Sequence, residues 1–180
     1  ARVRGLHLPE KHVQRNGQAI PGALMDFALY FLLNYQQRLQ QGSGVYYYLP
    51  KLEHSDEAKW WADVFHFTEE KFNLKTSTIR ATVLIETLPA VFQMHEILYA
   101  LKDHIAALNC GRWDYIFSYI KTLKAHADRV LPDRQVVSMD KPFLNAYSRL
   151  LVKTCHQRGA LAMGGMAAFI PSKDPAENEK

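Results

Sequence analysis

The sequence predicts an α/β fold in which helices cover a parallel sheet. Short apolar runs rich in β-branched and aromatic residues alternate along the chain with longer segments of helical periodicity. The runs are also nearly continuous in hydrophobicity, as is typical of strands that are buried on both faces. The chain has 180 residues, 48% of them hydrophobic, which is enough to bury a sizeable core.

The expected elements follow one another in strand–helix order. The expected strands are Val45–Leu49, Ile79–Ile85, 105–109, 136–139 and 160–163, and residues 1–7 are expected to end another. The expected helices are Gly22–Gln40, 55–72, 91–101, 115–124 and 141–158. Ser55 is expected to cap the start of its helix, and Gly159 to end the last helix.

These candidate strands fit either an open doubly wound sheet or most of an eight-stranded β/α barrel. Hydrophobic periodicity does not separate the two architectures. The sequence contains neither GxGxxG nor GxxxxGK[ST], which weakens the nucleotide-binding version of the open sheet.

Composition limits the function classes. The net charge of +4 comes from scattered Lys and Arg residues without a nucleic-acid-binding motif, so we expect no nucleic-acid partner. No apolar run reaches the roughly 18 residues that a membrane span needs, so we expect no membrane partner. Cys110 and Cys155 are not spaced as CxxC, which favours two free thiols in a reducing compartment.

Two carboxylates follow neighbouring expected strands. Glu86 comes directly after Ile79–Ile85, and Asp114 stands just beyond the end of the next strand. The carboxyl ends of parallel strands form the active-site face of α/β folds, and a carboxylate pair without His or Cys suits a hard cation such as Mg²⁺. The alternative is that each acidic residue stabilises the N-terminus of a following helix.

Three other features are candidates for binding. Arg2 and Arg4 offer fixed cations near the first strand, although an Arg there is more often simply solvated. Gly111 stands where backbone N–H groups at a helix start could face an anion, or it is an ordinary turn glycine. The segment after Gly164 and Gly165 carries apolar residues at Met166, Phe169 and Pro171, which fit either a ligand channel or a buried loop.

Residues 102–117, KDHIAALNCGRWDYIF, resemble the signature of the malate synthase family, with Ala107 where the family pattern has Gly. The resemblance extends over the whole chain and implies a (β/α)8 TIM barrel, of which this chain holds about six of the eight units. Residues 1–180 would then be the central part of the barrel domain. An N-terminal region, the last barrel units and a C-terminal helical domain would lie outside it.

The resemblance also implies a reaction. Malate synthases condense acetyl-CoA with glyoxylate and hydrolyse the product to malate and CoA, with Mg²⁺ as cofactor. Glu86 and Asp114 match the family's Mg²⁺ ligands. Arg2, three residues before Gly5 in the Gly-x-His-Leu segment, matches the catalytic arginine, with Arg4 as the alternative register.

The remaining family positions complete the expected site. Gly111, Trp113 and Asp114 match the turn whose amides hold the glyoxylate carboxylate, and Met166, Phe169 and Pro171 match a loop that borders the acetyl-CoA channel. The family's general base, an Asp, would lie outside this chain, so the chain alone is expected to be inactive.

Two alternatives remain open. One is a related Mg²⁺-dependent barrel lyase that cleaves citryl-CoA or malyl-CoA, although such lyases lack the Trp113-Asp114-Tyr115 pattern. The other is a catalytically inactive fragment. The expected compartment is the cytoplasm for a bacterial source, or the peroxisome or glyoxysome for a eukaryotic one. The sequence does not predict an oligomeric state.

Overall fold

A computed structural model describes residues 1–165 and has the predicted α/β class. Its main sheet has four parallel strands in the order β3-β4-β5-β6, where β3 is Val45–Leu49, β4 Ile79–Ile85, β5 Ile105–Cys110 and β6 Leu161–Met163. Sequential parallel neighbours joined by helical crossovers are the pattern of a β/α barrel wall.

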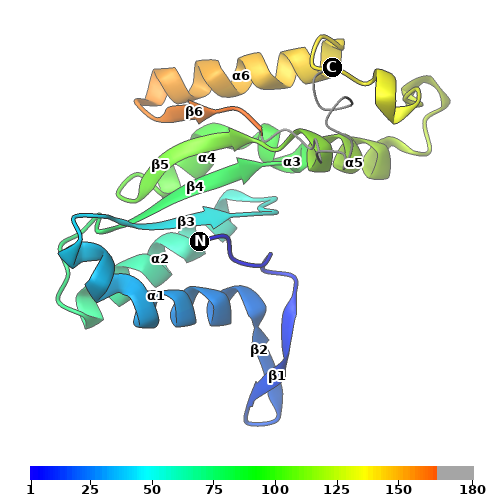
Figure 1. Cartoon of the computed structure of the whole chain (residues 1–180). Coiled ribbons are helices and arrows are strands. Elements are labelled where there is room, and N and C mark those ends of the chain that lie inside the picture. Colours follow the sequence, from blue (N-terminus) through cyan, green and yellow to red (C-terminus); the bar gives the residue numbers. More distant parts are fainter. Residues whose placement is uncertain (166–180) are drawn as a thin grey trace, which may run out of the picture.

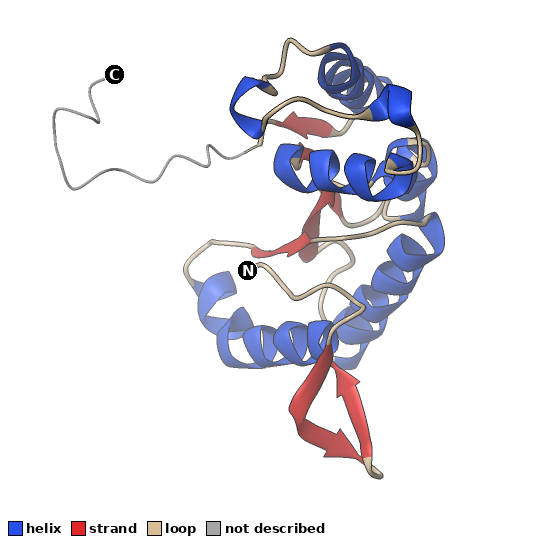
Figure 2. Cartoon of the chain, turned by 90° about the vertical axis from the view of Figure 1, so that its right-hand side faces the viewer, coloured by secondary structure: helices blue, strands red, loops and turns tan. Residues whose placement is uncertain are grey.

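Within residues 1–165, six α-helices precede, connect or follow these strands. They are α1 (Gly22–Gln40), α2 (Ser55–Lys71), α3 (Leu88–Val91), α4 (Met94–Ala100), α5 (Arg112–Leu123) and α6 (Pro142–Arg158). Figure 1 shows the strands as one row, and in Figure 2 the helices lie along the outer side of this row. The described residues therefore form part of a barrel wall with its helical layer.

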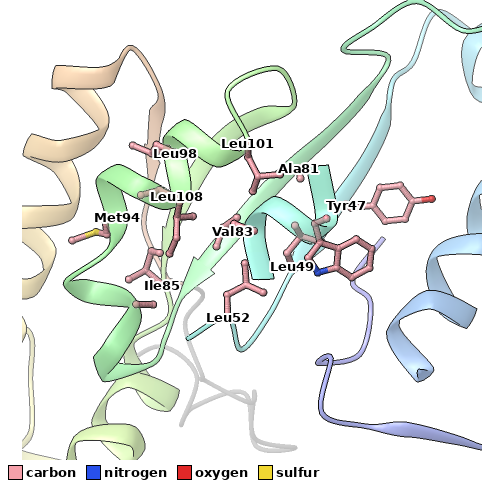
Figure 3. Packing of buried hydrophobic residues seen from close by; sticks show 14 of the residues in the cluster. Tyr47, Leu49, Leu52, Ala81, Val83, Ile85, Met94, Leu98, Leu101 and Leu108 are labelled. Carbon is pink, nitrogen blue, oxygen red and sulfur yellow. The ribbon is translucent and has the colours of Figure 1, made fainter. Parts of the chain in front are cut away.

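The hydrophobic core lies between the strands and the helices (Figure 3). Alternate residues of β3 and β4, such as Tyr47, Leu49 and Val83, have 1% exposure or less and pack against this helical layer. Tyr46, the residue before Tyr47, is 54% exposed because a strand turns successive side chains to opposite faces. The second face of the sheet is thus left for side chains of the barrel interior.

The first residues of the chain extend the row of strands at β3. Arg2 forms an isolated parallel bridge with Tyr48, and the Tyr48 N–H donates to the Ala1 carbonyl at 2.7 Å. Because Tyr48 is paired with Thr82, Arg2 shares the face of Tyr48 and Thr82. The expectation that residues 1–7 end a strand holds for the residues around Arg2, after which the chain leaves the sheet.

Three sequence predictions were wrong in detail. Residues 136–139 are not a strand: a short 3-10 turn occupies Arg134–Val136, and β6 pairs directly with β5, so the described residues hold one strand fewer than expected. The helix expected at 91–101 is divided into α3 and α4. His54, not Ser55, caps α2, since its Nδ1 accepts from the Asp56 N–H at 3.1 Å.

A hairpin was missed altogether. Strands β1 (Pro9–Arg15) and β2 (Gln18–Pro21) pair antiparallel and project away from the sheet (Figure 1). Asn16 and Gly17 form the two-residue turn with φ of 52° and 76°, the left-handed values that Asn-Gly turns adopt. The Asn-Gly dipeptide between polar runs was the available signal.

The expectations for Gly159 and for the two cysteines are confirmed. Gly159 ends α6 with a φ of 70°, and Cys110 and Cys155 are free, buried thiols. Within residues 1–165, none of the helices combines the length and the apolar character needed to cross a membrane.

Candidate active site

Glu86 and Asp114 meet at the carboxyl ends of β4 and β5. Glu86 follows the last residue of β4, on the interior face that alternation assigns to Thr82 and Leu84. Asp114 lies in the first turn of α5, just after β5. An oxygen of each carboxyl group lies within 3.4 Å of the same Lys51 Nζ, so the two groups come close enough to act on one ligand.

The helix-cap alternative does not apply to Glu86. Thr87, not Glu86, is the N-cap of α3: its hydroxyl accepts from the Ala90 N–H at 3.4 Å and donates to the Leu52 carbonyl at 2.7 Å. Glu86 is left with only 1% exposure and no helix to cap. Asp114 does lie near a helix N-terminus, so a favourable interaction with the α5 dipole accompanies its place in the pair.

Gly111 permits the close approach of the two strand ends. A Cβ at position 111 would lie 2.6 Å from the Glu86 Cβ and 3.1 Å from its Oε2. The φ of Gly111 is −80°, so proximity, not backbone freedom, requires glycine here. Gly111 is also the N-cap of α5 and has no side chain to satisfy the first amides, which leaves these N–H groups available to an anion.

Lys51 is a site residue that sequence reasoning missed. It lies just beyond β3, and its Nζ is 2.7 Å from Asp114 Oδ1 and 3.4 Å from Glu86 Oε1. Its backbone N–H also donates to Glu86 Oε1 at 2.8 Å. The rule that selected Glu86, a polar residue just after a predicted strand, would have selected Lys51 as well.

The carboxyl groups are held in unequal electrostatic environments. Burial raises the pKa of Glu86, and the hydrogen bond with Asp114 raises it further. Burial also acts to raise the pKa of Asp114, but hydrogen bonds from Lys51 and Glu86, together with the charge of Arg2, bring it below its usual value. Such a divergent pair needs a positive charge to keep both groups ionised.

The two arginines have separate surroundings. Arg2 acts electrostatically on Asp114, so it lies on the side of the site. Arg4 is bound elsewhere, with its Nε and Nη2 at 2.9 and 2.8 Å from the Asp26 carboxylate and its Nη2 2.8 Å from Glu10. Residues two apart in a strand share a face, but Arg2 and Arg4 have different partners because the chain leaves the sheet after Arg2.

The remaining predicted site residues are Trp113 and the three residues of the expected acetyl-CoA channel. The Trp113 ring packs under the guanidinium groups of Arg112 and Arg134, at 4.7 and 5.5 Å, so only its backbone can serve the α5 N-terminus. Its buried Nε1 has no partner among the described residues. Met166, Phe169 and Pro171 lie outside the described residues.

A cavity of about 410 Å³ opens over the carboxylates. Among the residues that line it are Leu6, His7, Lys51, Glu86, Thr87, Asp114, Phe117, Ser118 and Lys121. Within residues 1–165 no group of three or more His, Cys, Asp or Glu side chains is arranged to hold a metal. Mg²⁺ does not need one, because it keeps several waters and uses one or two carboxylates plus substrate oxygens. The oxygen pair of Glu86 and Asp114 fits this requirement, and Lys51 shows that a cation is already favoured between them.

A parallel β/α wall with carboxylates at its strand ends defines a barrel-type domain with a candidate site at the carboxyl ends of its strands. All of residues 1–180 match the family model of the malate synthase TIM-barrel domain. The chain therefore belongs to the malate synthase family.

Curated relatives agree with this assignment. Malate synthase A of Escherichia coli is 72% identical over 179 residues, which are 99% of this chain and 34% of that protein. The glyoxysomal malate synthase of Brassica napus is 59% identical over 182 residues, covering 99% of this chain and 32% of that protein. The chain thus spans about a third of the length of these relatives.

Solved structures resemble the chain in fold. A lead(II) complex of Haloferax volcanii malate synthase has a TM-score of 0.66 at 15% identity and covers 99% of this chain and 44% of that chain. A citrate lyase from Burkholderia xenovorans has a TM-score of 0.59 at 20% identity over 76% of this chain and 40% of that one. At these identities the likeness concerns the fold alone.

Proposed function

We propose that the protein carrying this chain condenses acetyl-CoA with glyoxylate to give malate and CoA, and that it uses Mg²⁺. The observation that carries the proposal is the convergence of Glu86 and Asp114 around one positive charge at the carboxyl ends of β4 and β5. Family membership and 72% identity to Escherichia coli malate synthase A support it. A related Haloferax volcanii protein has been solved with magnesium and glyoxylate, and also with pyruvate and acetyl-CoA.

The substrate chemistry fits the charges of the site. Glyoxylate has an aldehyde and a carboxylate, and the first turn of α5, which has no capping side chain, offers the amides of Trp113 and Asp114 for the carboxylate. The Gly111 N–H already donates to the Ile85 carbonyl at 3.4 Å. Glu86 and Asp114 would hold Mg²⁺, which when bound polarises the aldehyde oxygen as a Lewis acid. Arg2 approaches the same group of charges and would stabilise oxygen charge that grows in the transition state.

The covalent steps are those that the family resemblance implies. A base removes a methyl proton from acetyl-CoA, and the resulting carbon nucleophile forms a bond to the aldehyde carbon, whose oxygen takes up a proton. Water then cleaves the thioester, which releases malate and CoA. By the family resemblance, this base is an Asp outside residues 1–180, and we assign Glu86 and Asp114 to the cation instead.

The test uses the full-length protein and follows CoA release with a thiol reagent. We expect release only when acetyl-CoA, glyoxylate and Mg²⁺ are all present, and we expect a metal chelator to abolish it. Cleavage of citryl-CoA or malyl-CoA without condensation would favour the lyase alternative. Metal binding without any turnover would favour an inactive protein.

The cellular compartment is a proposal of the same kind. Relatives include proteins from bacteria and proteins named glyoxysomal from plants and yeast. We propose the cytoplasm if the source is bacterial, and the peroxisome or glyoxysome if it is eukaryotic.

A further inference from the structure

The connection after β3 contains an unusual backbone conformation. Lys51 has a φ of +63°, in the left-handed region that L-residues other than Asn, Asp and Gly rarely adopt. Among residues 1–165, the other non-glycine residues with positive φ are Asn16, Asn73 and Ser77, all short and polar. Lys51 is the only long side chain in this group, so its backbone strain is retained at a position where glycine would be free of it.

The strained backbone places both ends of Lys51 on the carboxylate pair. Its N–H donates to Glu86 Oε1 at 2.8 Å, which fixes one ligand oxygen. The side chain then turns back over the pair, and its Nζ lies 2.7 Å from Asp114 Oδ1 and 3.4 Å from Glu86 Oε1. Glycine would keep the first contact and lose the second.

The ammonium occupies the place that a divalent cation needs. A Mg²⁺ ligand oxygen lies about 2.0–2.1 Å from the metal. Asp114 Oδ1 cannot bind Mg²⁺ at that distance and keep its 2.7 Å contact with Nζ unless two cations become close neighbours. Departure of the ammonium relieves the repulsion between the two cations.

We propose that Lys51 is a positioning residue that competes with the metal: its N–H fixes Glu86, and its ammonium holds the two carboxylates together until Mg²⁺ displaces it. This inference rests on the Mg²⁺ site proposed above. The side chain is 33% exposed at the edge of the cavity, so it can swing aside without disturbing the core. In this scheme, the wild-type protein trades metal affinity for a preassembled pair of ligands.

The test measures Mg²⁺ affinity of the full-length protein without substrates, by isothermal titration calorimetry with MgCl₂ at pH 8. Lys51→Gly keeps the N–H donor and suits the left-handed backbone, but it removes the ammonium. We expect it to bind Mg²⁺ about tenfold more tightly than wild type, because a like charge has left the site. Lys51→Arg should bind more weakly, since a planar guanidinium bridges two carboxylates better than an ammonium does.

Lys121→Met is the matched control, because Lys121 lines the same cavity but makes no ion pair with the carboxylates among the described contacts. Its Mg²⁺ affinity should stay within about twofold of wild type, as expected for a solvent-screened charge. If wild type binds Mg²⁺ and Lys51→Gly binds it equally or more weakly, Lys51 does not compete with the metal. If neither wild type nor Lys51→Gly binds Mg²⁺, the metal site of the proposed function is wrong as well.

Discussion

The two ends of the parallel sheet each hold a buried carboxylate, but they use it differently. At the carboxyl ends, Glu86 faces a cavity, and its oxygens meet Asp114 and Lys51. At the amino ends, Glu69 is 3% exposed, and its Oε1 accepts from the Ile79 N–H at 2.7 Å while Oε2 accepts from the Ser77 N–H at 3.3 Å. His104 lies beside it with no exposure.

The two carboxylates differ in the partners that their oxygens have. Glu69 accepts hydrogen bonds from backbone donors at the start of β4, so its charge is compensated by groups of the fold itself. Glu86 receives one backbone donor, and its other partners are a second acid and the Lys51 ammonium. Burial alone therefore does not distinguish the two carboxylates; their partners do. This agrees with the general rule that the carboxyl ends of barrel strands perform chemistry and the amino ends provide stability.

The largest expected effect comes from removing the rest of the protein. Residues 1–180 made alone keep both clusters, but by resemblance they lack the base that deprotonates acetyl-CoA. A general base supplies about 10²–10⁴-fold of rate, and an unclosed barrel leaves exposed sheet edges. We expect no malate above background in a CoA-release assay. Turnover comparable to that of a full-length enzyme would place a base within this chain.

Asp114→Asn tests the carboxyl-end cluster directly in the full-length protein. It removes one charged ligand, and loss of metal-assisted polarisation worth several kcal/mol should lower kcat by about 100-fold or more. The unfolding temperature should change by only a few degrees, since Asp114 is 44% exposed. Asp63→Asn, a substitution at an exposed acid of α2, is the control. An active, Mg²⁺-dependent Asp114→Asn enzyme would remove this residue from the site.

Arg2→Lys and Arg4→Lys separate the two arginines. Arg2→Lys should lower kcat about tenfold or more with a smaller change in KM for glyoxylate, because Lys lacks the planar donor pair. Arg4→Lys should leave kcat unchanged and instead weaken the contact with Asp26 and Glu10 that ties the chain start to α1 and the hairpin. Steady-state kinetics of both variants distinguish the two arginines. A loss of kcat in Arg4→Lys but not in Arg2→Lys would show that Arg4 occupies the position of the family's catalytic arginine.

Glu69→Ala should break the amino-end cluster without touching catalysis. It leaves the Ile79 N–H buried and unpaired, which should cost about 2–4 kcal/mol of unfolding free energy. Activity per folded molecule should stay near wild type. Glu70→Ala, at the exposed neighbouring acid, is the matched control in urea unfolding. A large loss of kcat in Glu69→Ala, with stability retained, would contradict the division between the two ends.

The smallest effect is a pH dependence of stability from His104. Burial lowers the pKa of His104 below 6.5, although the Ile79 carbonyl and Glu69 act in the opposite direction. The unfolded chain therefore binds a proton more readily than the native one, so stability should fall as pH drops below about 6.5, by at most about 1.4 kcal/mol per pH unit. His104→Gln should flatten this part of the profile in urea unfolding between pH 5 and 7.5. An unchanged slope would show that His104 does not determine this pH dependence.

Much of the sheet could be predicted from sequence because its strands are continuous apolar runs. The bounds of β3 and β4 agree with the prediction, as do those of α1. Residues 136–139 misled because Val-Val-Ser-Met has strand composition, yet β6 takes the place beside β5 and leaves no partner for that segment. Composition reports which residues can form a strand, and pairing is decided by the tertiary fold.

Only part of the candidate site could be predicted from the sequence. The strand-end rule predicted that Glu86 and Asp114 lie close together, and in the structure both contact the Lys51 ammonium. Their roles remain predictions. Lys51 was missed because a lysine after a strand is usually solvated, and nothing local reveals its left-handed backbone. Likewise the tight fit of Gly111 on Glu86 depends on the pairing of two strands, which no single segment encodes.

The Gly111–Glu86 contact also restricts how this sequence can change over time. Any side chain at position 111 would press on the Cβ of residue 86, 2.6 Å away, so relief would require a smaller residue at 86. That relief would delete the carboxylate itself. A second substitution at residue 86 therefore cannot both relieve the clash and keep the carboxylate. Substitutions of Gly111 are excluded as long as the protein needs the carboxylate of Glu86. A random library at position 111, selected for growth on two-carbon compounds, should return glycine alone.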